Sequence, residues 1–146
     1  MFSKIISMFF QRKEKVDTNS SAKRIIYYSE PKKTFILAQQ ITGIPDSNKP
    51  YFWNRKGNTM DDYLQLAQKS EILYKKWCQG TPISELLKDP DCKNVAQAYL
   101  DELQMVQVYK ISNSEYRWAN DGRHRTVAAQ KLDIHILVKI LGEYTS

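Results

Sequence analysis

The sequence predicts an α+β fold, in which helices surround a small mixed β-sheet. The chain has 146 residues, of which 42% are hydrophobic, and this is enough for one domain with a core. Apolar residues recur at helical spacing in the middle of the chain, whereas after Leu103 they alternate or run continuously, as strands do. We therefore assign residues 1–23 to an N-terminal segment with a linker, and residues 24–146 to a single domain.

The N-terminal segment has the pattern of a short amphipathic helix. Residues 1–10 are apolar, and four of them share one helical face: Phe2, Ile5, Ile6 and Phe9. The basic residues follow this run, unlike those of a secretory signal, and ten residues are too few to span a bilayer. We expect the segment to dock on its own domain; a protein partner or a membrane surface is the alternative.

Two extended segments and a loop are expected next. Residues 24–28 and 34–41 are rich in β-branched and aromatic side chains, as strands are. Residues 43–57 contain proline, glycine and asparagine, which predict a loop. Its aromatic run either packs on the core, which is the more frequent role, or stacks on bases. The second interpretation makes nucleic-acid-binding candidates of Trp53, Arg55 and Lys56.

Three helices are predicted between residues 60 and 103. The first spans about residues 60–79 and ends at Gly80. The second is short, begins at Thr81-Pro82 and stops before Asp89-Pro90. The third spans about residues 93–103.

The last third of the chain predicts a hairpin, a glycine turn, a helix and a strand. The hairpin arms are residues 105–111 and 115–119, the helix is 126–132, and the aliphatic strand is 134–141. Asn120 or Asp121 is expected to cap the helix, and Gly122 to allow the tight entry. His135, within the aliphatic strand, is interpreted as a structural histidine.

The start of this helix predicts an anion site. Arg123, His124 and Arg125 stand where unpaired amides and the helix dipole already concentrate positive charge. A bound anion offsets this repulsion between positive charges, because free amides and guanidinium groups both suit phosphate oxygens. The alternative is that the three side chains diverge and that Arg125 pairs with an acidic residue such as Glu102.

Composition is compatible with an anionic partner. The net charge is +6 and the isoelectric point is about 9.2, which fits an anionic partner, the alternative being a merely soluble basic protein. Two cysteines without a histidine cluster indicate reduced thiols in a cytoplasmic protein, with neither a metal site nor a disulfide expected.

Residues 122–129 (GRHRTVAA) resemble the phosphate-binding motif of the ParB/sulfiredoxin superfamily. The corresponding run in ParB proteins is Gly-Glu-Arg-Arg followed by Ala-Ala, and in sulfiredoxins it is Gly-Cys-His-Arg with an alanine further on. Gly122, Arg125 and Ala128 match both. The resemblance covers about residues 96–141. It implies a ParB/sulfiredoxin-like fold that binds CTP, ATP or nucleic acid, and that transfers or hydrolyses phosphate or cuts DNA.

Departures from the family narrow this expectation. Arg123 stands where sulfiredoxins keep their catalytic cysteine, so sulfinic acid reduction is not expected. The chain shows neither a second ParB nucleotide motif nor a helix-turn-helix region after residue 141. The resemblance therefore predicts a standalone ParB-like domain of the N-terminal or nuclease type.

The resemblance implies phosphate or nucleotide ligands at Gly122, Arg123, Arg125 and Thr126. Phosphoryl transfer also needs a group that positions water, often together with Mg²⁺. His124 is the candidate acid or base. Asp121 is the adjacent carboxylate, although capping is its more frequent role, and Glu30 and Glu102 are more distant candidates.

Two classes of function remain open. One is a nuclease or a nucleotide phosphohydrolase that uses ATP or CTP with Mg²⁺. The other is a non-catalytic nucleotide- or DNA-binding module that acts through a protein partner.

Overall fold

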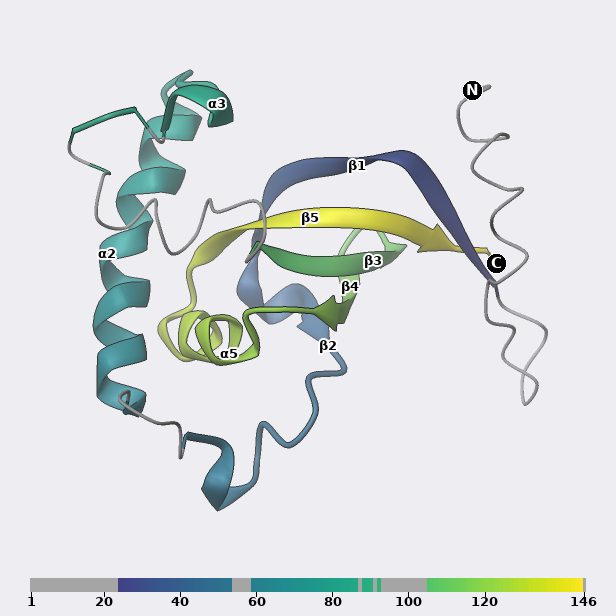
Figure 1. Cartoon of the computed structure of the whole chain (residues 1–146), viewed down its shortest axis with the longest axis horizontal. Coiled ribbons are helices and arrows are strands. Elements are labelled where there is room, and N and C mark those ends of the chain that lie inside the picture. The colour runs from purple at the N-terminus through teal and green to yellow at the C-terminus, as the bar shows by residue number, and fades with distance from the viewer. Residues whose placement is uncertain (1–23, 54–58, 87, 91, 93–104, 146) are drawn as a thin grey trace.

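The computed structural model describes residues 24–53, 59–86, 88–90, 92 and 105–145. Figure 1 shows a twisted sheet with helices packed at one end of it. The predicted N-terminal segment, the predicted helix at 93–103 and the candidate residues Arg55, Lys56 and Glu102 lie outside the described residues.

The mixed sheet predicted from the sequence is confirmed. Its five strands are β1 (Ile25–Leu37), β2 (Ile41–Thr42), β3 (Val106–Ser112), β4 (Glu115–Asn120) and β5 (His135–Tyr144). Their order is β1-β5-β3-β4-β2. The pairs β1–β5 and β3–β4 are antiparallel, whereas β3–β5 and β2–β4 are parallel.

The described helices are α2 (Met60–Cys78), α3 (Ile83–Leu86) and α5 (Arg123–Leu132), with 3-10 turns η2 (Ala38–Gln40) and η3 (Pro50–Trp53). The start of α2 is a capping box, because the Thr59 hydroxyl accepts from the Asp62 amide while the Asp62 carboxylate accepts from the Thr59 amide. After the helix, Gly80 takes a positive φ of 105°, as expected of a helix-ending glycine.

The structure corrects the prediction for residues 24–41. The two expected extended segments form the single strand β1, and the second ends at Leu37 rather than at Ile41. Pro31 lies in the irregular part of the β1–β5 pairing, between Tyr27 and Lys32, where an edge strand tolerates proline. The chain then turns at η2 because the Gln130 side chain donates to the carbonyls of Ala38 and Ile41.

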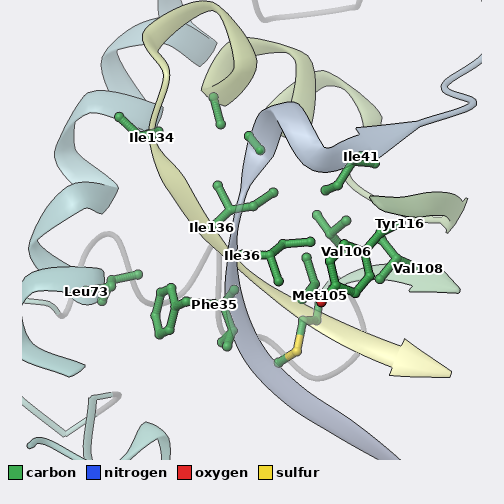
Figure 2. Close-up of a cluster of buried hydrophobic side chains, with 14 of the residues drawn as sticks. Phe35, Ile36, Ile41, Leu73, Met105, Val106, Val108, Tyr116, Ile134 and Ile136 are labelled. Carbon is green, nitrogen blue, oxygen red and sulfur yellow. The ribbon is translucent and has the colours of Figure 1, made fainter. Parts of the chain in front are cut away.

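Core side chains lie between α5 and one face of the sheet, and the same cluster extends to Phe35 on β1 and Leu73 on α2 (Figure 2). Alternate residues of β3 and β5 are buried there, and they are in register across the parallel pair: Val106 with Val138, and Val108 with Ile140. Ala128 and Ala129 on α5 are completely buried. Small side chains at these positions let the helix backbone approach the sheet. The start of α5 is thereby held directly beyond the end of β4.

Near the C-terminal end of β5, Gly142 allows the backbone of β5 to lie close to that of β1. A β-carbon at this position would contact the Ile26 carbonyl oxygen and would lie 2.9 Å from Tyr27 Cα. Only glycine avoids this collision between the two backbones, so the residue type is dictated by strand pairing.

Two tyrosines at this end of the sheet have raised pKa values. The Tyr28 hydroxyl donates to Glu143 at 2.8 Å. Burial, followed by this hydrogen bond, raises the pKa of Tyr28 above its ordinary value. Burial and a hydrogen bond with Tyr27 likewise raise the pKa of Tyr109.

These shifts predict that the protein loses stability in alkali. Unfolded tyrosine titrates near pH 10, and the two folded tyrosines titrate higher. The folded state therefore holds more protons above about pH 10, and the free energy of unfolding falls as the pH rises through that range. Urea unfolding between pH 8 and 11 measures this slope. Tyr28→Phe with Tyr109→Phe should flatten it, and an unchanged slope in the double variant would contradict the assignment.

Candidate functional site

The turn between β4 and α5 is built from two consecutive left-handed residues. Asp121 has a φ of 60° and Gly122 a φ of 68°. The Trp118 indole N–H donates to the Asp121 carbonyl at 3.0 Å. The amide and the hydroxyl of Thr126 both donate to the Gly122 carbonyl, at 2.9 and 2.8 Å. These bonds fix the direction in which α5 leaves the sheet.

The prediction that Asn120 or Asp121 caps this helix is wrong. The N-cap residue is Gly122, which has no side chain to make a capping hydrogen bond. A capping side chain normally comes from a residue with extended backbone angles, whereas Asp121 is left-handed and precedes the cap. Helix α5 also begins at Arg123, three residues earlier than predicted.

Arg123 is half-buried in the first turn of α5. Its guanidinium carbon lies 5.5 Å from the centroid of the Phe52 ring, which is within range of a cation–π contact. This contact brings a cation and the loop element η3 together at the start of the helix.

His124 is buried and joins three elements. Its Nε2 lies 2.7 Å from the carbonyl oxygen of Phe52. A carbonyl only accepts hydrogen bonds, so we assign the proton to this nitrogen. The imidazole stacks on Tyr63 of α2, with centroids 5.3 Å apart and planes at 21°, and lies 4.5 Å from the Phe52 ring. His124 therefore anchors η3 and α2 to α5.

Arg125 is also buried, with 9% of its surface exposed. Its guanidinium lies against the Gly122 turn, because a β-carbon on Gly122 would be 2.8 Å from Arg125 Nη2 and 2.6 Å from Val106 Cγ2. Thr126 is completely buried, and its hydroxyl is used within the turn. The predicted residues 122–126 are thus contiguous in space, but only the first two of them are half-exposed.

The aromatic run of the loop packs on the domain. Phe52 is buried, and Trp53 lies 4.9 Å from the Phe52 ring, 5.9 Å from His124 and 6.0 Å from Tyr63. This arrangement favours the core-packing interpretation of the loop for these two rings. Tyr51, by contrast, is 55% exposed.

The candidate carboxylates are dispersed. Asp121 is half-exposed beside the turn, whereas Glu30 is exposed in the irregular part of β1. Within the described residues, no group of three or more His, Cys, Asp or Glu side chains is arranged to hold a metal ion. His135 stacks on Tyr74 at 3.9 Å, in keeping with the structural role predicted for it.

Three residues that build the site were not predicted from the sequence. Trp118 fixes the turn, Phe52 accepts the His124 hydrogen bond, and Tyr63 stacks on His124. Phe52 belongs to an aromatic run that is visible in the sequence, but His124 lies 72 residues away from it. A local pattern does not reveal such a pairing.

Comparison with protein-family models, with curated proteins and with solved structures gives no match for this chain. In the part of the chain that the structure describes, no helix is long and apolar enough to cross a membrane.

Proposed function

We propose that this chain binds the phosphate of a nucleotide or a nucleic acid at the start of α5, as the ParB/sulfiredoxin resemblance implies. One observation carries the proposal. The N-cap residue of the helix is a left-handed glycine, which has no capping side chain, and Arg123 stands in the first turn. A phosphate would accept hydrogen bonds there and offset the charge of Arg123.

Each residue of the turn has a part in this proposal. Gly122 keeps the approach to the helix open, since it carries no side chain. Arg123 is the half-exposed cation that contacts phosphate oxygens. Arg125, which the family resemblance would make the main ligand, adds its positive charge from its buried position beside Gly122. The Thr126 hydroxyl fixes the turn by donating a hydrogen bond to the Gly122 carbonyl.

The packing of His124 supports binding more than catalysis. A general acid or base exchanges its proton with the reacting group, whereas Nε2 of His124 is hydrogen-bonded to the Phe52 carbonyl within an aromatic cluster. A nucleotide- or DNA-binding module that acts through a protein partner is therefore the form of the proposal that we favour.

Hydrolysis of a nucleotide or cleavage of nucleic acid is the second candidate function. It is favoured by the half-exposed carboxylate of Asp121, which directly precedes Gly122 and Arg123. A single carboxylate suits Mg²⁺ that arrives with ATP or CTP, because this ion is usually held by one or two carboxylates together with substrate phosphates. Mg²⁺ would supply positive charge to the transferring phosphate.

Incubation with nucleoside triphosphates and with plasmid, each with and without Mg²⁺, separates the two forms. Binding without product release supports the module. Mg²⁺-dependent release of phosphate or nicking of plasmid, lost in Asp121→Asn, would instead support the enzyme.

We predict that Arg123→Ala weakens nucleotide binding about tenfold or more, since a hydrogen bond to a charged group contributes about 1.5–3 kcal/mol. Stability should change little. The cation–π contact with Phe52 is lost, but an unfavourable cation at a helix N-terminus is also removed, and each effect amounts to about 0.5–1 kcal/mol. Calorimetric titration with ATP and CTP, together with melting curves, measures both quantities.

The matched control is Lys131→Ala, which removes an exposed cation from the last turn of the same helix. It should leave nucleotide affinity unchanged. Equal affinities for the wild type, Arg123→Ala and Lys131→Ala would reject the proposed site.

A further inference from the structure

A row of residues in register crosses all five strands of the sheet. Tyr27 is paired with Gly142, Gly142 with Tyr109, Tyr109 with Arg117, and Arg117 with Thr42. Paired residues on neighbouring strands direct their side chains to the same face. Because Val108 belongs to the core, its neighbour Tyr109 lies on the opposite face. We call these five residues the tyrosine row.

Aromatic rings gather along this row. The rings of Tyr27 and Tyr109 meet edge to face across Gly142, with centroids 5.8 Å apart and planes at 77°. Tyr144, two residues beyond Gly142 on the same strand, contacts Tyr109 at 6.2 Å. All three tyrosines are half-buried, so part of each side chain reaches the surface.

Cations stand beside the rings on the same face. Arg117 is exposed and is the direct cross-strand neighbour of Tyr109. Its stem runs along Gly43, where a β-carbon would lie 3.2 Å from Arg117 Cγ. The adjacent row of this face contains Lys33 paired with Lys139, and Lys139 paired with Gln107.

This surface is separate from the start of α5. The Gly122 turn lies against Val106, on the core face of the sheet. Helix α2 packs at the opposite end of β5, where Tyr74 contacts Phe35 and His135. The tyrosines instead lie toward the Tyr144 end of that strand.

We propose that the tyrosine row, together with the neighbouring Tyr144, binds single-stranded nucleic acid, with bases stacked on Tyr109 and Tyr144 and a backbone phosphate held by Arg117. Aromatic rings beside cations on a sheet provide the two interactions that a single strand requires. A duplex keeps its base faces stacked inside, so the single strand is the form that fits. The net charge of +6 favours the same partner. Because this surface lies on the opposite face, the inference does not rest on the proposed function of α5.

The test is the binding of fluorescein-labelled oligothymidine to the full chain, followed by anisotropy over a range of salt concentrations. Tyr109→Leu and Tyr144→Leu should each weaken binding about tenfold, because a stacked base is worth that much or more. Tyr109→Phe keeps the ring and should retain affinity. Arg117→Ala should weaken binding and reduce its salt dependence by about one phosphate contact. The exposed Lys75 on α2 supplies the control variant Lys75→Ala.

Melting curves of every variant establish that the fold is intact, and Arg117→Ala keeps the test usable if a tyrosine variant is unstable. No binding of oligothymidine at low salt would overturn the inference. Full affinity in both Tyr144→Leu and Arg117→Ala would overturn it as well. If oligothymidine binding is lost in Arg123→Ala alone, the nucleic acid binds at the start of α5 and not on the sheet. If the protein binds no nucleotide but loses oligothymidine binding in Arg117→Ala, the site on the sheet is supported and the proposed site at the start of α5 is rejected.

Discussion

Arg125→Ala is expected to destabilise the fold by about 2–5 kcal/mol, because it leaves buried hydrogen-bond acceptors unsatisfied and opens a cavity. Only 9% of the surface of Arg125 is exposed. A guanidinium in such a position is tolerated only where hydrogen-bond acceptors compensate for its lost hydration. Its deletion leaves those acceptors unsatisfied, and it also opens a cavity beside Gly122 and Val106.

This expectation matters because domains are commonly stable by only about 5–15 kcal/mol. Loss of nucleotide binding in Arg125→Ala would by itself say nothing about phosphate contacts, since part of the sample would be unfolded. Binding and melting temperature must therefore be measured on the same preparation. Arg117→Ala provides the matched control, because it removes an exposed arginine and should change stability by less than about 0.5 kcal/mol.

The two possible roles of Arg125 give different outcomes. A structural role predicts that the melting temperature falls sharply and that binding follows the folded fraction. A direct phosphate contact predicts lost affinity in protein that melts like the wild type. A melting temperature equal to that of Arg117→Ala would show that the buried guanidinium contributes little to stability.

Most strands and helices could be predicted because their signals are local. The alternation in β3, the aliphatic run in β5 and the ends of α2 each lie within a few neighbouring residues. The continuity of β1 could not be predicted in this way. Pro31 and its polar neighbours favour a break, and only the pairing with β5 carries the strand through them.

The candidate site was predicted as a stretch of sequence but not as an arrangement. The glycine turn and the helix after it follow from local composition, so Gly122 was predicted at the entry to a helix, although the helix begins at Arg123, three residues earlier than predicted. The burial of His124 and Arg125 depends on Phe52, Tyr63 and Val106, which come from three other elements. Charge pattern alone treated the three basic residues alike, whereas tertiary packing separates them.

Gly122→Ala is expected to destabilise the protein by about 2–5 kcal/mol, for two separable reasons. A non-glycine residue in the left-handed region costs about 1–2 kcal/mol, and Gly122 has a φ of 68°. Steric overlap costs a further amount of about 1–3 kcal/mol. The overlap arises because the new β-carbon would lie 2.6 Å from Val106 Cγ2 and 2.8 Å from Arg125 Nη2.

Gly80→Ala separates these two costs. Gly80 also has a positive φ, 105°, but a β-carbon there would meet no atom within 4 Å. It should therefore show a backbone cost without the overlap. Urea unfolding measures the loss in each variant, and the overlap should make Gly122→Ala the less stable of the two.

Combining Gly122→Ala with Val106→Ala tests the cause of that difference. If the overlap with Val106 is responsible, the double variant should lose less stability than the sum of the two single changes, because the deleted methyl groups make room for the β-carbon. Strict additivity would place the cost on Arg125 instead. In that case the displaced guanidinium should reduce nucleotide affinity in Gly122→Ala even where the protein remains folded. The glycine would then serve the proposed phosphate site through the position of Arg125 as well as through the shape of the turn.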